Sequence, residues 1–400
     1  MKIKFLTIAR LPLIIAALAI GVSSCNKIYE PVGSSGVITG DAANTLYKKL
    51  AANSNYSILV AALTRTGLWM ALDQPTSSFT FFAPDNAAFT ASGLSLAAVN
   101  AMPEAQLLAV LQHHLIPNQK IMAADIPTTF ANFEVKSALN LTTAPISATA
   151  AIPIKMSVFP SRRAGGAWIN NMPIKTPDAI SGSNGVVHTV AAIVAPPTRL
   201  LLDTISRDPE FKYLVAAIQR ADSGLSTTAA PSIQYYLGNA TIAPGANFTV
   251  FAPTDAAFKA LVYGLVYKQV FTLTGNAAAA DAQANLAVAA GPAFLASNNV
   301  TTELVRGILA YHVIPLQRAF GVNFPTTPAA FPTFLNTVIA SHPGITVGVT
   351  LSGTTNMAVA LSVKGVGNAT PAAAVPTALG IDRPAVNGVF FKIDQVLLPQ

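Results

Sequence analysis

The chain has 400 residues, of which 52% are hydrophobic and only 10% are charged, and its formal net charge is +7. This length fits two domains of ordinary size, and the apolar composition argues against intrinsic disorder. The positive charges do not form basic runs with interleaved aromatic residues, so nucleic acid is not expected as a partner.

The first residues predict a secretion signal that ends at a site of lipid attachment. Three basic residues within the first ten precede an apolar run at residues 11–22, which is too short to span a bilayer comfortably. The sequence Val-Ser-Ser-Cys that ends at Cys25 resembles the lipobox of bacterial lipoproteins, in which the cysteine becomes the acylated first residue after cleavage. We therefore expect residues 1–25 to be a lipoprotein signal peptide, with the lipid on Cys25.

Cys25 is the only cysteine, so neither an intramolecular disulfide nor a cysteine metal cluster is expected. Residues 26–39 are rich in Gly, Ser and polar residues without a sustained apolar period, which is typical of a flexible tether. No later stretch of the sequence qualifies as a membrane span. The expected location is the cell envelope, with the protein lipid-anchored at the outer membrane or the cell surface.

Three landmarks occur twice in the chain, in the same order. They are FTFFAPDNAAF (79–89) and FTVFAPTDAAF (248–258), HHLIP (113–117) and YHVIP (311–315), and NGVVHTVAAIVAP from Asn184 and NGVFFKIDQVLLP from Asn387. Chance similarity has no reason to preserve order over so much sequence, so the repeats predict a duplicated domain. Their spacing places the domains at residues 40–197 and 198–400.

The first landmark predicts a buried strand that leads into a helix. Apolar side chains on both faces of residues 248–251 are typical of a strand covered on both sides, and Pro253 ends its pairing. Thr254 or Asp255 is then expected to cap a helix that begins at Ala256. Because each buried phenylalanine contributes roughly 1.5–3 kcal/mol, this landmark is interpreted first as a folding element.

The second landmark ends an apolar helix with His113 and His114 in one copy and with Tyr311 and His312 in the other, each pair followed by a proline that stops the helix. A histidine at a helix C-terminus can donate to the terminal carbonyls. We interpret His114 and His312 as buried hydrogen-bonding residues, the alternative being metal ligands or catalytic bases. All four residues are candidates for a structural or interaction motif.

The third landmark opens with an Asn-Gly turn signal and continues as a terminal strand. The stretch before it, such as Ile345–Val363, predicts several short strands, whereas Thr45–Leu72 and Leu200–Arg220 show helical spacing of apolar residues. Each half is therefore predicted to run helix, strand, helices and then strands.

Together the three landmarks resemble the fasciclin domain, over about residues 45–197 and 200–399. The resemblance implies an α+β fold with a wedge-like core of β-strands flanked by helices, and a general role in cell adhesion and extracellular interaction. The first copy departs from the family pattern, since His113 replaces the tyrosine of the Tyr-His motif and Ala191 replaces the usual acidic residue of the closing strand. In the second copy Phe391 stands where the first copy has His188.

The second copy also carries two insertions. Phe89 to His114 spans 25 positions but Phe258 to His312 spans 54, and the alanine-rich excess around 275–296 is expected to add a helix or loop to one surface. Another insertion around residues 226–247 contains Tyr235 and Tyr236. These tyrosines are expected either to contact a protein or sugar partner from a loop or to pack beneath that loop.

The sequence offers no constellation of catalytic residues. There is no G-x-S-x-G elbow, and the five histidines, His113, His114, His188, His312 and His342, show no metal-ligand spacing such as H-E-x-x-H. Glycine clusters lack the context of a phosphate loop, and acidic residues are too few and scattered for a carboxylate pair or a calcium loop. We therefore expect no enzyme activity, no metal and no cofactor.

The leading hypothesis is a lipid-anchored envelope protein that mediates adhesion or matrix interaction with a protein or glycan at the cell surface. The alternative is an envelope module that binds a polysaccharide or an apolar small ligand in a groove near the insertions. In a third hypothesis the protein is an enzyme, and its candidate general bases are His114, His188 and His312.

Overall fold

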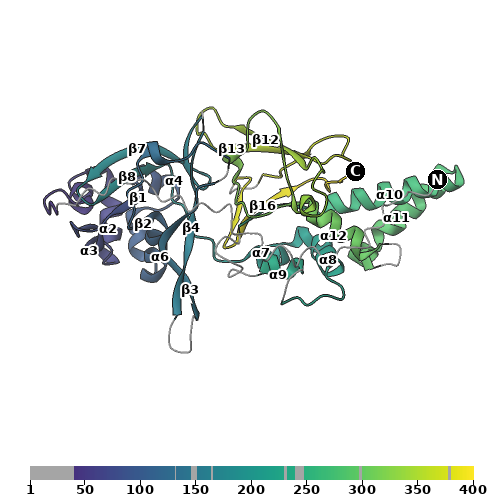
Figure 1. Cartoon of the computed structure of the whole chain (residues 1–400), viewed down its shortest axis with the longest axis horizontal. Helices are drawn as coiled ribbons and strands as arrows, with labels where there is room; N and C mark the ends of the chain where they lie inside the picture. The colour runs from purple at the N-terminus through teal and green to yellow at the C-terminus, as the bar shows by residue number, and fades with distance from the viewer. Residues whose placement is uncertain are drawn as a thin grey trace. The chain divides into compact units, whose positions relative to one another are not determined.

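The computed structural model describes residues 40–130, 132–145, 151–163, 165–228, 232–238, 247–296, 300–376 and 380–400. The predicted signal peptide, Cys25 and the tether lie outside these residues. The described chain divides between Pro197 and Thr198 into two compact units, and the short segment Ser352–Met357 groups with the first. Figure 1 shows helices and strands in both units, which confirms the predicted α+β class. Within the described ranges, no helix has the length and apolar character needed to cross a membrane.

The helices of the first unit are short, and several begin at a polar capping side chain. Thr45, Asp85 and Ser95 each accept a hydrogen bond from the backbone N–H three residues later, which satisfies one of the free donors at a helix start. These helices are α1 (Leu46–Ala51), α2 (Ser57–Arg65), α3 (Trp69–Leu72), α4 (Asn86–Ala91), α5 (Leu96–Ala101) and α6 (Glu104–His114).

The main sheet of the first unit has the strand order β2-β1-β8-β7-β6-β5. β1 and β8 run parallel, whereas the other neighbouring strands pair antiparallel. The strands are β1 (Phe79–Pro84), β2 (Leu115–Pro117), β5 (Pro160–Arg163), β6 (Gly166–Ile169), β7 (Met172–Gly182) and β8 (Gly185–Val190). A separate antiparallel pair consists of β3 (Val135–Pro145) and β4 (Ala151–Val158).

The second unit repeats this plan and adds longer helices. Its sheets have the orders β10-β9-β16-β15 and β11-β12-β13-β14. The helices are α7 (Leu201–Arg207), α8 (Lys212–Ala221), α9 (Ile233–Gly238), α10 (Asp255–Thr274), α11 (Ala277–Ala289) and α12 (Thr302–Tyr311). The strands are β9 (Phe248–Pro253), β10 (Val313–Ile314), β11 (Ala329–Phe331), β12 (Ile345–Leu351), β13 (Ala358–Lys364), β14 (Ala372–Ala373), β15 (Arg383–Ala385) and β16 (Gly388–Ile393).

The predicted buried strand is present in both units, between two apolar layers. Every residue of β1 and of β9 is buried. In the first unit Phe81 packs with helix residues such as Leu59, whereas Phe82 packs with strand residues such as Val158. Successive side chains of a strand point to opposite faces, so this landmark joins the helix layer to the strand layer.

The third landmark forms the parallel partner of the first. Phe79 pairs with Gly185 in one unit, and Phe248 pairs with Gly388 in the other. A Cβ atom at Gly185 would lie 2.1 Å from the carbonyl oxygen of Phe79, and one at Gly388 would lie 2.5 Å from that of Phe248. The glycine of the Asn-Gly pair therefore serves close approach of two strands as well as the turn.

The helix after β9 starts one residue earlier than predicted. It begins at Asp255, and the side chain of Thr254 is the cap, accepting from the backbone N–H of Ala257. Asp255 instead accepts from the backbone N–H of Tyr213 at 2.8 Å, and Asn86 does the same for Ile58 at 3.0 Å in the first unit. In each unit, therefore, one side chain caps the helix that follows it, α4 or α10. The next side chain in sequence caps a second helix, α2 in the first unit and α8 in the second.

Candidate functional site

The histidines at the ends of α6 and α12 have the same surroundings in both units. Nδ1 of His114 donates to the carbonyl oxygen of Val110 at 2.8 Å, and Nε2 accepts from the backbone N–H of Val194 at 2.9 Å. The side chains of His113 and His114 are both buried, and that of His114 is fully buried. The ring thus connects the last turn of α6 to the segment that follows β8.

His312 makes the equivalent connection in the second unit. Its Nδ1 donates to the carbonyl oxygen of Ile308 at 2.7 Å, and its Nε2 accepts from the backbone N–H of Leu397 at 2.9 Å. Burial lowers the pKa of His114 and of His312 to about 4. Both imidazoles are therefore neutral at pH 7, and both ring nitrogens already have backbone partners.

The residues that precede these histidines are also interior. His113 is 1% exposed and Tyr311 is fully buried. The hydroxyl of Tyr311 donates to the carbonyl oxygen of Gly344 at 2.6 Å and accepts from the backbone N–H of Val366 at 3.1 Å. Burial raises the pKa of Tyr311. The Tyr-His motif thus faces the core, where a partner cannot contact its side chains without a rearrangement.

His188 and its counterpart Phe391 occupy matching positions on β8 and β16. His188 stacks on Phe82 with ring centroids 5.2 Å apart, and Phe391 stacks on Phe251 at 5.6 Å. In addition, Nδ1 of His188 accepts from the backbone N–H of Asp178 at 3.0 Å, and Nε2 donates to the carbonyl oxygen of Ile121 at 2.8 Å. Burial lowers the pKa of His188. Its ring is used for stacking and for backbone hydrogen bonds.

Sequence reasoning missed the role of the asparagines that open the third landmark. Asn184 accepts from the backbone N–H of Leu46 at 2.8 Å and donates to the carbonyl oxygens of Leu72 and Gln74 at 2.8 and 2.9 Å. Its side chain therefore caps the start of α1 and holds the end of α3. The Asn-Gly pair indicates only a turn, because its tertiary partners are more than a hundred positions away.

Asn387 repeats this arrangement. It accepts from the backbone N–H of Leu201 at 2.9 Å and donates to the carbonyl oxygens of Tyr236 and Leu237 at 3.4 and 3.0 Å. It thereby connects the start of α7 to the end of α9. Identity of the asparagine in both copies was the available signal for this role.

The threonine of the first landmark also has the same partners in both units. Thr80 donates to the carbonyl oxygen of Gln119 and accepts from the backbone N–H of Ile121. Thr249 bonds Gln317 and Ala319 in the same way. Each hydroxyl fixes the loop that follows the histidine-ended helix to the central strand.

The prediction that Tyr235 and Tyr236 stand on a loop was wrong, because both lie on helix α9. This short helix forms since the carboxylate of Asp222 accepts from the backbone N–H groups of Ile233 and Gln234, each at 2.8 Å. Tyr236 packs its ring against Phe248, with centroids 6.3 Å apart. Both tyrosines are half-buried, and their proposed contact with a partner stays a prediction.

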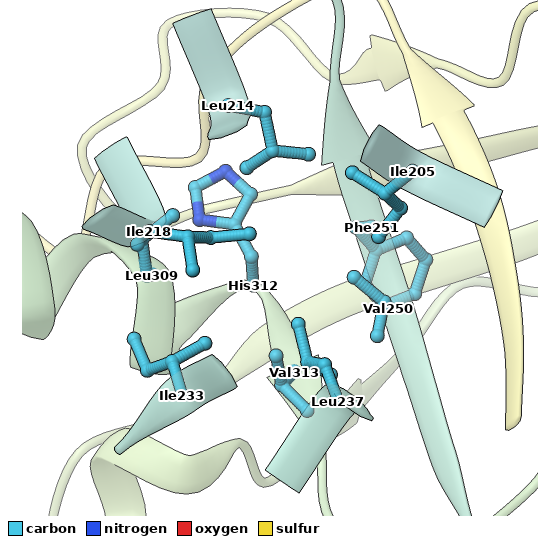
Figure 2. Close-up of a pocket in the computed structure, with 10 residues that line it drawn as sticks. All are labelled: Ile205, Leu214, Ile218, Ile233, Leu237, Val250, Phe251, Leu309, His312 and Val313. Atoms are coloured by element: carbon cyan, nitrogen blue, oxygen red, sulfur yellow. The ribbon is translucent and has the colours of Figure 1, made fainter. Parts of the chain in front are cut away.

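A small apolar cavity lies beside His312, as Figure 2 shows. Helices α7, α8 and α9 and strand β9 contribute to its lining, with Leu214, Ile218 and Leu309 close to the imidazole. Its volume is about 20 Å³, enough for roughly one water molecule. Both imidazole nitrogens are bonded elsewhere and the other lining residues are apolar, so this cavity is a packing defect rather than a ligand site.

A metal site would need several ligand side chains close together. In the part of the chain that the structure describes, no group of three or more His, Cys, Asp or Glu residues could hold a metal ion. The buried Lys392 forms two ion pairs, with Nζ 2.6 Å from a carboxylate oxygen of Asp208 and 2.5 Å from one of the more exposed Glu210. Its Nζ also lies 5.2 Å from the ring centroid of Phe211, so two carboxylates and an aromatic ring compensate the charge of Lys392.

Comparison with known proteins identifies a protein family, a related protein sequence and a solved structure of similar fold. The family model described as "Fasciclin domain" matches residues 54–196 and 210–399. The chain is 30% identical over 159 residues to "Protein sll1483" of Synechocystis sp., across 39% of this chain and 76% of that protein. A solved FAS1 domain pair from the insect cell adhesion molecule Fasciclin I matches 88% of this chain and 95% of its own, at 14% identity and a TM-score of 0.32.

Proposed function

We propose that this chain, which belongs to the fasciclin domain family, is a lipid-anchored cell-envelope protein that mediates adhesion or extracellular interaction. Its two tandem domains bind a protein or glycan partner at the cell surface through their outer surfaces. Neither a catalytic step nor a cofactor is part of this function.

The observation that carries this proposal is the use of the landmark side chains inside both domains. His114, His188 and His312 were the candidate bases, and each ring bonds backbone groups through both nitrogens. A general base or a metal ligand needs a free nitrogen lone pair directed at its substrate or metal. These histidines stabilise the fold instead, which leaves the domain surfaces to carry the activity.

Anchoring is proposed from the sequence around Cys25. The lipobox resemblance and the Gly- and Ser-rich composition of residues 26–39 support a lipid anchor that is followed by a short tether. Two domains on one tether raise the effective concentration of the second binding event once the first has occurred, provided that both reach the partner. A weak affinity of each single domain for the partner is then sufficient for firm attachment of the cell.

The adhesive function is tested with beads coated with residues 25–400 carrying Cys25→Ser, mixed with cells of the species that makes the protein. We expect saturable attachment that free chain displaces, compared with beads carrying an unrelated protein of similar mass and charge. Attachment equal to that control would sink the proposal. Treatment of the cells with protease or with glycosidase separates a protein partner from a glycan partner.

Anchoring is tested separately by protease shaving of intact cells, with mass spectrometry of the N-terminal peptide. We expect peptides from both domains in the supernatant and a lipid-modified peptide that begins at Cys25. The Cys25→Ser variant, which lacks the proposed site of lipid attachment, is expected to be released into the medium. An unmodified cysteine, or domains that resist shaving, would contradict the proposed location.

A further inference from the structure

The two helices of the second domain's insertion form an antiparallel hairpin. Helix α10 has 20 residues, whereas α4, its counterpart in the first domain, has 6. Figure 1 shows α11 running back beside α10. Among the described residues of α10, none beyond Val262 is buried, so the outer half of this helix packs on α11 rather than on the domain core.

The hairpin exposes large apolar side chains. Leu265 is 57% exposed, Phe271 44%, Leu273 77% and Leu286 63%. Charged residues are scarce, since α10 contains Asp255, Lys259 and Lys268, and α11 contains Asp281 alone. A helix that is apolar around its circumference is normally buried, and an exposed apolar patch of a few hundred Å² marks an interaction site.

A membrane does not fit this surface well. A helix that lies in the membrane interface needs one polar and one apolar face, and neither α10 nor α11 has this division because apolar residues surround both. Spanning is also excluded for the helices that the structure describes, as none is long and apolar enough. The remaining occupant with matching chemistry is another apolar helix pair.

A second copy of the hairpin offers that match. Helix α10 has a net charge of +1, from Lys259 and Lys268 against Asp255, and α11 has −1 from Asp281. In an antiparallel arrangement about a twofold axis, α10 of each copy lies against α11 of the other, so the opposite charges meet. The same arrangement places Leu265 of α10 against the small alanines that dominate α11 of the other copy, which permits close helix packing.

We propose that the α10–α11 hairpins of two copies of this chain pack together as a four-helix bundle. A 13-residue helix is about 20 Å long, so a face two helices wide covers on the order of 400 Å² per copy. This area is about half that of a standard interface, which is typical of a weak association, and we propose a dimer with a Kd in the micromolar range.

The proposal is tested by sedimentation velocity of residues 25–400 carrying Cys25→Ser. We compare the parent chain with Leu265→Lys/Leu286→Lys and with a matched control, Leu96→Lys/Leu316→Lys, whose leucines are exposed to 46% and 58% outside the hairpin. The parent and the control are expected to dimerise alike. The hairpin variant is expected to weaken the dimer at least ~100-fold, since buried charges without partners oppose association.

Every changed leucine is exposed, so all three chains are expected to fold. Circular dichroism and the midpoint of thermal unfolding check this expectation. A parent chain that stays monomeric up to about 200 μM overturns the proposal, since that excludes a micromolar Kd. Equal weakening in the control overturns it too. So does a monomeric parent chain that floats with phospholipid vesicles and loses this binding in the hairpin variant, because the occupant would then be lipid.

Discussion

The backbone N–H of Val194 donates to Nε2 of His114 at 2.9 Å, which ties the segment after β8 to the end of α6. The N–H of Leu397 makes the same bond to His312 at the same distance. A duplicated hydrogen bond across 80 and 85 positions of sequence shows that the histidine acts as a clamp between the middle and the end of each domain.

The first prediction concerns pH. The pKa of His114 and of His312 is about 4 in the folded chain, against about 6.5 when unfolded. Because the pKa is depressed in the folded chain, only the unfolded chain binds a proton between pH 6.5 and 4. The free energy of unfolding is therefore highest above pH 6.5 and falls as the pH falls toward 4. Each histidine is expected to lower the free energy of unfolding of its domain by on the order of 3 kcal/mol between pH 7.5 and pH 4.

Urea unfolding at a series of pH values from 7.5 to 4 measures this loss. Carboxylates titrate in the lower part of the same range, so the double variant His114→Gln/His312→Gln is the control. Its free energy of unfolding should be lower at pH 7.5 and should depend less steeply on pH. Parallel pH profiles for the two chains would show that the histidines do not carry the effect.

The second prediction concerns the buried asparagines. Asn184→Ala removes the acceptor for Leu46 and the donors to Leu72 and Gln74, leaving buried backbone groups without partners. The first domain is expected to lose about 2–4 kcal/mol. Asn100→Ala, at an exposed position, should change the unfolding free energy by less than about 0.5 kcal/mol. Similar losses in both variants would contradict the capping role.

The third prediction tests the close approach of β1 and β8. Gly185→Ala would place a methyl group 2.1 Å from the carbonyl oxygen of Phe79, so the parallel pairing must open. We expect a loss of at least about 3 kcal/mol or a first domain that does not fold.

Gly264→Ala on α10 is the matched control, because a Cβ atom at this position meets no atom within 4 Å. Alanine favours helix over glycine by about 1 kcal/mol, so thermal unfolding should show a small gain of stability. A Gly185→Ala chain with parent-like stability would refute the steric argument.

The fourth prediction concerns backbone strain after the second landmark. Leu316 has φ 57°, and its counterpart Asn118 has φ 61°. The left-handed region costs most residues about 1–2 kcal/mol, whereas asparagine tolerates it better. Leu316→Asn is therefore expected to stabilise the second domain by roughly 0.5–1 kcal/mol.

Urea unfolding of Leu316→Asn and Leu316→Ala measures this gain. Leucine 316 is exposed, so little packing is lost in either variant, and alanine keeps the Cβ atom that causes the strain. Equal stability of the two variants would show that side-chain loss, rather than backbone conformation, decides the outcome.

The duplication, the buried strand that leads into a capped helix, the helix that ends in histidine and the closing strand after Asn-Gly can all be predicted from the amino-acid sequence. These features depend on local periodicity and on chemistry within a few residues, which the chain displays directly. The interior position of His114 and His312 was predictable for the same reason, since an apolar helix carries them into the core.

The hydrogen-bond partners of those side chains are known only from the folded structure. The partners of Asn184 lie 110–138 positions away in sequence, and no periodicity encodes such a distance. Tyr235 and Tyr236 lie on a helix because Asp222, from a preceding segment, caps its N-terminus. Local pattern fixes which side chains are buried, whereas the pairing of buried polar groups depends on how distant segments of the chain meet, since each such group must find a partner there.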